Sequence, residues 1–545
     1  MIKVLENIKG KTALSLLSDE EKKKYYCVCI NGHLKDLNYT FKSNEKTTLE
    51  FLDITNQEAS RIYEASFRFL IILALKSINK DYDARFFYNI SRGTFVRIYY
   101  KDKEMKITPD FVENLEPVIE DIIKENIIFE RHKIALDEAI KRYKEEHLSD
   151  KLNLLKYREE DFVHYYEATY RKYTYIDYLY SPLVPSSSYL KHYTLNYLAP
   201  GIIVQLPRPE LKGKIAPFIG EPKFESMLIS SSRWAEKVKL DTVYNINSFI
   251  KEKSPLGLIN ISETKINGML TRLGDEIEAR KTVKLICIAG PSSSGKTSFA
   301  NRLTYELMSR GINSLRLSLD NFYLPRKDRP KNSNADSLEA FDIELLNKTL
   351  LQLMQFETVS LPKYDFTTGE RTILSKAKIS PEQVIILEGI HALNEKMTYL
   401  VSTIEKYLIY ISPQPQINVD NHSPIPITDI RLLRRISRDS RTRNTSASST
   451  LAYWHVVRDA EFKYIYPTQE NADFIFDSFT HYELCVIRDI VLPQLEKITQ
   501  DDPSYLTAQR LIHTVKYFSP ISSEDIPCNS LIREFIGGTS FKDAV

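Results

Sequence analysis

A glycine- and serine-rich segment stands between an apolar run and a helical pattern. The run VKLICIA leads into Gly290-Pro-Ser-Ser-Ser-Gly295-Lys296-Thr297, and SFANRLTYELMSRG follows. GxxxxGK[ST] between a strand and a helix is typical of a loop whose backbone N–H groups bind phosphate oxygens. Lys296 would reach the β- and γ-phosphates of ATP, and the Thr297 hydroxyl would bind Mg²⁺. The ATP-binding residues expected in this loop are Gly290, Ser292, Ser293, Ser294, Gly295, Lys296, Thr297 and Ser298.

Two acidic residues end the next apolar runs. SLRLSL is followed by Asp320, and VIIL is followed by Glu388. Ligands of open α/β sheets bind beyond the carboxyl ends of the strands, so Asp320 is expected to point into the same crevice as Lys296. A carboxylate there can take the proton of a hydroxyl that attacks the γ-phosphate. Glu388 suits a Mg²⁺ ligand. A turn aspartate and a surface glutamate are the ordinary alternatives.

Arginines are concentrated between residues 429 and 443. The segment DIRLLRRISRDSRTR has six arginines within thirteen residues, and spacings of three and four put most of them on one helix face. Because arginine offers a fixed fork of donors, a lid that clamps the triphosphate is favoured. A solvated helix face and an RNA-binding surface are the alternatives.

Strands and helices must alternate for these residues to meet. Helical patterns separate five expected strands, which predicts an α/β domain with a parallel sheet covered on both faces. The strands are expected at residues 283–289, 314–319, 384–387, 407–412 and 473–477. A helical linker is expected over residues 246–282, the kinase-like domain over 283–500 and a C-terminal extension over 501–545.

The N-terminal 245 residues have a different pattern. YYCVCI and LKDLNYTF flank Asn31-Gly32, a strong β-hairpin signal, and residues 1–58 are expected to form short strands. ASRIYEASFRFLIILALKSI predicts a helix that opens a mixed region over residues 59–245.

Composition is that of a soluble globular protein of about two to four domains. Hydrophobic residues make up 43% and charged residues 27% of the 545, and Lys+Arg 74 against Asp+Glu 72 argues against a chain-wide polyanion-binding surface. The five cysteines form no CxxC pair, and the longest apolar run, residues 69–75, is too short to cross a bilayer. We therefore expect a cytoplasmic protein without membrane contact.

Six segments together resemble the uridine kinase and phosphoribulokinase family. They are GPSSSGKT, SLDNFY, PKYDFTTGER, IILEGIHAL, TDIRLLRRISRDSRTR and YPTQENADFIFDS, which cover about residues 283–478 in the family's order. The resemblance implies a P-loop kinase that uses ATP and Mg²⁺ to phosphorylate the ribose 5′-hydroxyl of a nucleoside. It also implies that Asp320 is the base and acts with Lys296, that Arg438 and Arg443 clamp the triphosphate, and that Asp336, Tyr364 and Arg435 bind the acceptor.

This chain departs from that family where the nucleobase is read. Uridine-cytidine kinases carry a histidine that contacts the pyrimidine, and TTG places Gly369 there. They carry a glutamine near the position of residues 451–454, which read LAYW here. We therefore expect uridine to be a poor substrate or one of several, with Tyr364 and Trp454 supplying stacking.

The N-terminal half resembles parts of threonyl-tRNA synthetases. NGHLKDLNYTF is similar to a TGS domain, a β-grasp module, and residues 59–245, with DYLYSPLVPSSSYLKHYTL, are similar to the α+β editing domain. The editing HxxxH positions hold Ala65 and Phe69, and Leu179 and Leu183 stand where Cys and His would be. Without imidazole or thiol there is no metal ligand or general base, so the deacylase chemistry is expected to be lost. The histidines at 132, 164 and 192 are expected to be ordinary surface or core residues.

Three functions follow from these observations. A nucleoside kinase is favoured, because Asp320 with Asp336 suits a vicinal diol such as ribose. An RNA- or tRNA-binding regulatory NTPase, with RNA held by the N-terminal half, and a P-loop kinase for a non-nucleoside sugar are the alternatives. We expect a homo-oligomer.

Overall fold

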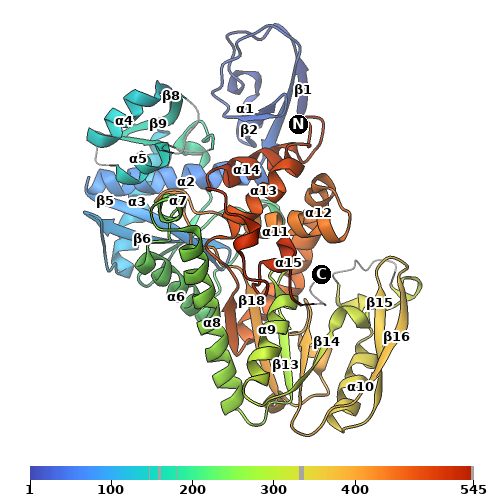
Figure 1. The fold of residues 1–545 in the computed structure, drawn as a ribbon. Coiled ribbons are helices and arrows are strands. Elements are labelled where there is room, and N and C mark those ends of the chain that lie inside the picture. Colours follow the sequence, from blue (N-terminus) through green and yellow to red (C-terminus); the bar gives the residue numbers. More distant parts are fainter. Residues whose placement is uncertain (146–147, 157–160, 179–180, 331–336, 542–545) are drawn as a thin grey trace.

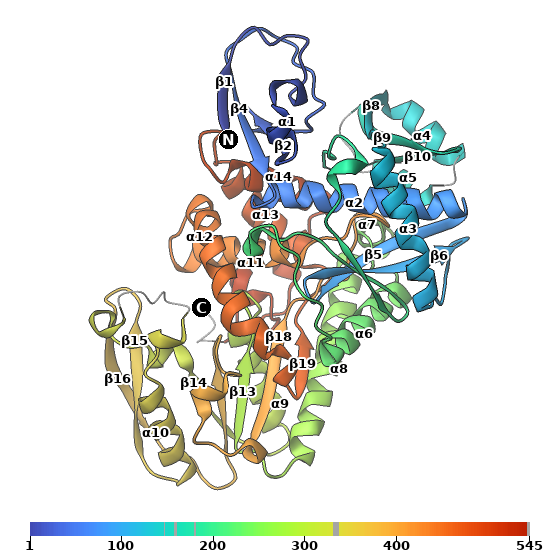
Figure 2. The ribbon, with the colours of Figure 1, turned by 180° about the vertical axis from the view of Figure 1, so that it is seen from behind.

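The computed structural model describes residues 1–145, 148–156, 161–178, 181–330 and 337–541. The N-terminal strands lie at one end of the molecule, and the sheet of the C-terminal half lies with its helices at the other (Figure 1). The long helix α2 (Gln57–Ile78) and the C-terminal helices α13 (Glu483–Leu495) and α14 (Tyr505–Lys516) lie between them, which is also seen from behind (Figure 2).

The first sheet is small and antiparallel. Its strands β1 (Ile2–Leu5), β2 (Tyr25–Ile30), β3 (His33–Lys35) and β4 (Thr47–Asp53) are ordered β1-β4-β2-β3, and α1 (Asp19–Lys22) packs on it. Asn31 and Gly32 have φ of 47° and 77°, so the expected hairpin turn is confirmed. The second strand of this hairpin, β3, ends at Lys35, which is earlier than LKDLNYTF predicted, because Leu37 and Phe41 turn into the apolar core.

Helix α2 is buried between two further sheets. The Asn56 side chain caps it by accepting the N–H groups of Glu58 and Ala59, and apolar side chains surround most of its circumference. Within the described ranges no helix is both long and apolar enough to span a bilayer, and α2 is covered by protein. The surrounding elements are β5 (Tyr82–Ile90), β6 (Gly93–Tyr100), β7 (Lys103–Glu104), α3 (Pro109–Glu125), β8 (Glu130–Ala135), α4 (Leu136–Glu145), α5 (Ser149–Leu155), β9 (Phe162–Tyr170), β10 (Tyr173–Tyr178), β11 (Thr194–Leu198) and β12 (Gly201–Gln205).

The C-terminal half is built on a parallel five-stranded sheet, as predicted. The order is β14-β17-β13-β18-β19, and each expected strand is found within two residues of its expected ends. The strands are β13 (Leu285–Ala289), β14 (Ser314–Ser318), β17 (Val384–Glu388), β18 (Lys406–Ser412) and β19 (Phe474–Asp477).

Both faces of this sheet are covered. On β13, Ile286 and Ile288 pack with α8 (Pro255–Ala279) and α9 (Lys296–Met308). Leu285 and Cys287 point to the opposite face and pack with α10 (Ile343–Met354). Strands buried on both faces are apolar at every position, which explains the continuous run LICIA.

The two halves of the chain share one core. Helix α6 (Pro222–Val238) precedes α7 (Val243–Glu252) in the sequence, but Phe224 and Leu228 of α6 pack with Tyr410 of the parallel sheet. Phe95 and Ile203 from the sheet around α2 belong to the same cluster. A chain cut near residue 246 would therefore expose apolar surface of the parallel sheet.

Four charged side chains join α2 to the C-terminal half. Asp429 lies in the first turn of α11 (Ile427–Thr442) and accepts from Arg61 of α2 at 2.9 Å and from Arg510 of α14. Arg510 also pairs with Glu58 at 3.2 Å. Burial alone would raise the pKa of Asp429, but Arg510 and Arg61 hold it below its usual value.

Replacing Arg510 by Ala should destabilise the whole protein. The Asp429 side chain is 3% exposed and would keep only Arg61 as its partner. Breaking a buried pair costs about 3–5 kcal/mol, so we expect a loss of about 3 kcal/mol in urea unfolding. The control is Lys516→Ala on the same helix, whose half-exposed pair with Glu496 should contribute about 0–1 kcal/mol. Equal losses for both variants would contradict this role.

Candidate active site

The glycine-rich loop connects β13 to α9. Ser293 and Gly295 have φ of 61° and 90°, which turns the chain sharply before the helix begins at Lys296. A Cβ on Gly290 would lie 2.0 Å from the carbonyl oxygen of Ile411 on β18. Only glycine therefore lets the loop leave the sheet at this point.

Lys296, Asp320 and Glu388 meet at the carboxyl edge of the parallel sheet. Lys296 follows β13 through the loop, Asp320 comes just after β14, and Glu388 is the last residue of β17; the three strands are neighbours in the sheet. Lys296 Nζ donates to the carbonyl oxygens of Gly290 at 3.1 Å and Pro291 at 3.2 Å. Burial lowers the pKa of Lys296, while the charges of Glu388, Glu534 and Asp320 raise it. Three carboxylates therefore lie close enough to Lys296 to act on its charge.

Asp320 begins a short turn after β14. Its backbone N–H donates to Ser318 Oγ at 3.4 Å, and the residue is open to solvent although protein atoms surround it closely. These surroundings raise the pKa of Asp320, while Lys296, Arg443 and Arg438 lower it. A carboxylate that solvent can reach and whose pKa is raised is suited to accept a proton.

Glu388 is a candidate metal ligand. Burial and the Asp320 charge raise the pKa of Glu388 to about 7, against the effect of Lys296 and of a hydrogen bond from Ser318. A cation would relieve this repulsion, and Glu388 and Thr297 offer the oxygen donors that Mg²⁺ prefers. In the described part of the chain, no three His, Cys, Asp or Glu side chains are grouped to hold a metal. Mg²⁺ commonly uses one or two carboxylates with substrate phosphates, so these residues fit it.

Arg431 and Arg434 of α11 support the loop from within the protein. Arg431 Nε donates to the carbonyl oxygen of Ser292 at 2.9 Å, and Arg434 Nη1 donates to those of Ser293 and Ser294 at 3.3 and 3.4 Å. Arg431 is paired with Glu461, and Arg434 with Glu483. The two side chains are 0% and 1% exposed, so the expectation that most of the arginine run forms a lid is wrong for them.

The other predicted arginines lie nearer the mouth of the site. Arg435 Nη1 donates to Ser292 Oγ at 2.9 Å, and Arg435 also pairs with Asp439 at 3.2 Å. Arg438 and Arg443 share Asp439 at 2.8 and 3.5 Å. Because both also act on Asp320, their positive charge faces the crevice.

Two glutamates that the sequence analysis missed bind backbone N–H groups of the loop region. The Ser292 N–H donates to Glu461 at 3.0 Å, and the Ser298 N–H donates to Glu534 at 3.1 Å. The unbalanced charge of the arginine run was the one available signal, since buried guanidinium groups require acidic partners. Nothing in the sequence indicates which acids these are.

The expected acceptor residues are only partly brought together. Tyr364 is buried in an aromatic group with Tyr323, and Arg329 donates to the Tyr364 hydroxyl at 2.5 Å. Gly369 has φ of 74° in the turn between β15 (Val359–Asp365) and β16 (Glu370–Ala377). Trp454 belongs to another cluster and lies against the Arg431 guanidinium at 5.2 Å. Asp336 lies outside the described residues.

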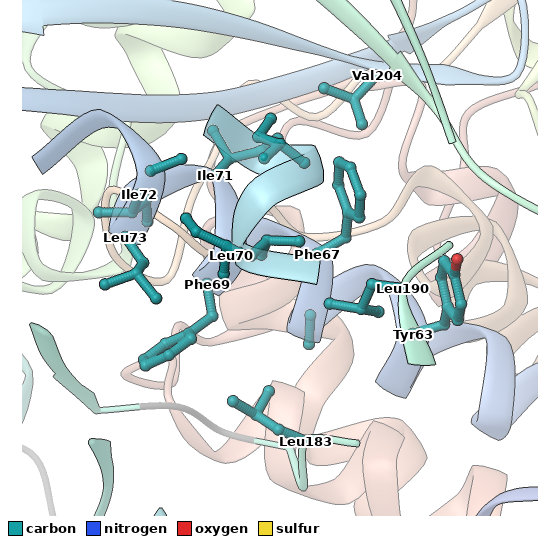
Figure 3. Close-up of a cluster of buried hydrophobic side chains, with 14 of the residues drawn as sticks. Tyr63, Phe67, Phe69, Leu70, Ile71, Ile72, Leu73, Leu183, Leu190 and Val204 are labelled. Atoms are coloured by element: carbon teal, nitrogen blue, oxygen red, sulfur yellow. The ribbon is translucent and has the colours of Figure 1, made fainter. Parts of the chain in front are cut away.

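The expected editing positions are part of an apolar core. Ala65, Phe69 and Leu183 are buried in the cluster around α2, and Figure 3 shows Phe69 and Leu183 among its side chains. The fourth expected editing position, Leu179, lies outside the described residues. The three described positions therefore present only hydrocarbon to one another.

Comparison with known proteins relates this site to kinases. The model of the Phosphoribulokinase / Uridine kinase family matches residues 285–484. A uridine kinase of Bacillus pumilus is 32% identical over 224 residues, which cover 40% of this chain and 95% of the relative. A uridine kinase of Lactobacillus johnsonii is 34% identical over 200 residues, which cover 35% of this chain and 84% of the relative.

Solved structures are more distant. The phosphoribulokinase from Rhodobacter spheroides is 16% identical, with a TM-score of 0.26, and the match covers 36% of this chain and 70% of that chain. At that TM-score the likeness carries no argument.

Replacing Glu388 by Gln should reduce the loss of stability with rising pH. The carboxyl has a pKa of about 7 in the folded protein against an ordinary 4.5, so folding retains a proton that the unfolded chain releases. The contribution of this proton to the stability of the fold is therefore fully present below pH about 4.5 and is lost as the pH rises through about 7. Glutamine does not titrate. In Mg²⁺-free buffer, the Tm of the variant minus that of the wild type should therefore rise from pH 5 to pH 8. A Tm difference that stays constant between pH 5 and pH 8 would contradict a raised pKa of Glu388.

Proposed function

Because the chain belongs to the phosphoribulokinase / uridine kinase family and is a phosphotransferase with an alcohol acceptor, we propose that it phosphorylates the ribose 5′-hydroxyl of a nucleoside with ATP. The observation that carries the proposal is the meeting of Lys296, Asp320 and Glu388 at neighbouring strand ends. It supplies a cation for the phosphates, a base for the acceptor and an oxygen ligand for a metal.

The transfer step uses the crevice in the following way. The acceptor hydroxyl oxygen forms a bond to the γ-phosphorus, the bond from that phosphorus to the β,γ-bridging oxygen breaks, and ADP leaves. The hydroxyl proton passes to the Asp320 carboxylate. Lys296, with Arg438 and Arg443, balances the charge of the phosphates, and Arg435 with Tyr364 contributes to the acceptor side.

Mg²⁺ is the metal that we assign to this reaction. Thr297 and Glu388 would hold it, and it would supply positive charge against the phosphates. The raised pKa of Glu388 supports this role, because a carboxyl in a repulsive environment gains most from a nearby cation.

The N-terminal half is proposed to consist of two domains without deacylase activity. We assign residues 1–58 to a TGS-like module and residues 59–245 to an editing-like domain without deacylase chemistry. The burial of Ala65, Phe69 and Leu183 in apolar surroundings supports the loss of that chemistry, since such side chains bind no zinc and activate no water. Hydrolysis of mischarged tRNA by the full chain would refute it.

Replacing Asp320 by Asn tests the base. Asn keeps the size and polarity of the side chain but cannot take the proton, and a positioned base typically contributes ~10²–10⁴-fold. We expect kcat to fall by that factor while ATP affinity changes little. Asp501→Asn, at an exposed position of the C-terminal extension, is the matched control. If Asp320→Asn retains more than about a third of wild-type turnover when chemistry is rate-limiting, another group takes the proton.

Specificity for the nucleobase should be weak. Gly369 offers no side chain, Leu451 is buried, and Trp454 packs on Arg431, so none of them supports hydrogen bonding to a pyrimidine edge. An apolar pocket discriminates by only ~10–200-fold. A panel of nucleosides and free sugars with ATP·Mg²⁺ should therefore give kcat/KM ratios of uridine to purine nucleosides within that range. A ratio above ~10³ would point to a donor such as Arg329, and a preference for free sugars would refute the nucleoside.

A further inference from the structure

A segment near the C-terminus lies against the phosphate loop. We call residues 531–541 the C-terminal strap; it contains α15 (Arg533–Ile536), and Figure 1 shows this helix close to α11. Leu531, Ile532 and Phe535 are buried in two hydrophobic clusters of the C-terminal half. The strap is therefore a packed part of the protein.

Helix α11 binds the backbone of the strap. Ser437 Oγ donates to the carbonyl oxygen of Phe535 at 3.0 Å, and Arg441 donates to that of Glu534 at 3.2 Å. The Phe535 ring lies 4.9 Å from the Arg434 guanidinium, and a Cβ on Gly295 would be 4.0 Å from it. These contacts hold Glu534 directly over the start of α9.

Glu534 accepts a hydrogen bond from a backbone N–H group that would otherwise be available to a phosphate. Its carboxylate accepts the N–H of Ser298 at 3.1 Å, and the residue is 8% exposed. Ser298 lies in the first turn of α9, whose N–H groups have no partner within the helix. In a glycine-rich loop of this kind these N–H groups bind phosphate oxygens. The carboxylate therefore has the position and the charge of a phosphate oxygen.

Glu534 differs from Glu461, the other carboxylate on the loop. Glu461 is paired with Arg431 and Arg458, so its charge is balanced whether or not a nucleotide is bound. In the described part of the chain, Glu534 forms no ion pair with lysine or arginine, and it acts on the charges of Lys296 and Glu388 from a distance. Displacing Glu534 leaves no side-chain cation without its partner, whereas displacing Glu461 would leave Arg431 unpaired.

We propose that the C-terminal strap is an internal competitor of the triphosphate, and that Glu534 must leave the Ser298 N–H before a nucleotide binds fully. The inference rests on the proposed use of this loop for ATP. One N–H cannot serve two anionic acceptors, and adjacent anions repel each other. The apparent affinity for ATP is then reduced by the fraction of molecules in which the strap is displaced.

Three variants of the full chain test the proposal through the Kd of ATP·Mg²⁺, measured by titration calorimetry without acceptor. Glu534→Ala removes charge and acceptor and should lower the Kd about 10-fold or more, as expected if a tenth or less of the molecules are open. Glu534→Gln keeps an oxygen for the Ser298 N–H but loses the charge, so its Kd should lie between those of Glu534→Ala and wild type. Glu524→Gln, at an exposed position before the strap, should bind as wild type does.

Hydrogen exchange of the wild type gives a second readout. Addition of ATP·Mg²⁺ should speed exchange in residues 531–541, because a strap that leaves α11 loses the packing that protects its own N–H bonds, such as those of Phe535 to Ile532 and of Gly537 to Arg533. A Kd for Glu534→Gln and Glu534→Ala that is unchanged or weaker, or slower exchange in the strap with ATP, would overturn the proposal. If none of the variants nor the wild type binds ATP, the proposed function falls with it. ATP binding without phosphorylation of any acceptor would refute the kinase substrate alone.

Discussion

The hydrogen bonds between two buried guanidinium groups and the carbonyl oxygens of the phosphate loop are the contacts on which the site depends. Arg431 and Arg434 bind Ser292, Ser293 and Ser294, and each guanidinium is neutralised by a buried glutamate. A charge left unpaired in such a place costs several kcal/mol. The loop, α11 and the segments that carry Glu461 and Glu483 must therefore fold together, and the loop does not keep its form by its own sequence alone.

The same helix links the site to the N-terminal half. Asp429 in its first turn is held by Arg61 and Arg510, while Arg431, two residues later, holds the loop. On the face of the parallel sheet that carries Cys287, α6 brings Phe224 and Leu228 into a core that continues to Phe95 and Ile203. The N-terminal half is thus built into the support of the parallel sheet.

Carboxylates rather than solvent satisfy two N–H groups in the loop region of this chain. Glu461 and Glu534 accept from Ser292 and Ser298, and their different ion pairing separates a permanent support from an exchangeable anion. Glu461 pairs with Arg431 and Arg458, and Glu534 acts on the charge of Lys296. The site therefore balances the charge of its cations before the triphosphate arrives, which lowers the cost of keeping several guanidinium groups together.

Local patterns in the sequence were enough to predict the glycine-rich loop, the five parallel strands, the Asn31-Gly32 hairpin and helix α2. Each depends on periodicity or on backbone angles that a few neighbouring residues determine. The place of Asp320 after a strand predicted its role, and the resemblance to a kinase family added those of Tyr364 and Arg435. The arginine run shows where such patterns end, because Arg431, Arg434, Arg435 and Arg438 have the same type and helical spacing. Periodicity states which residues share a helix face but not what that face meets. Only the tertiary structure decided that the first two are buried against glutamates, and that Glu534, 236 residues after Ser298, lies on its N–H. Such contacts depend on the packing of distant segments, and neither partner carries a local sign of the other.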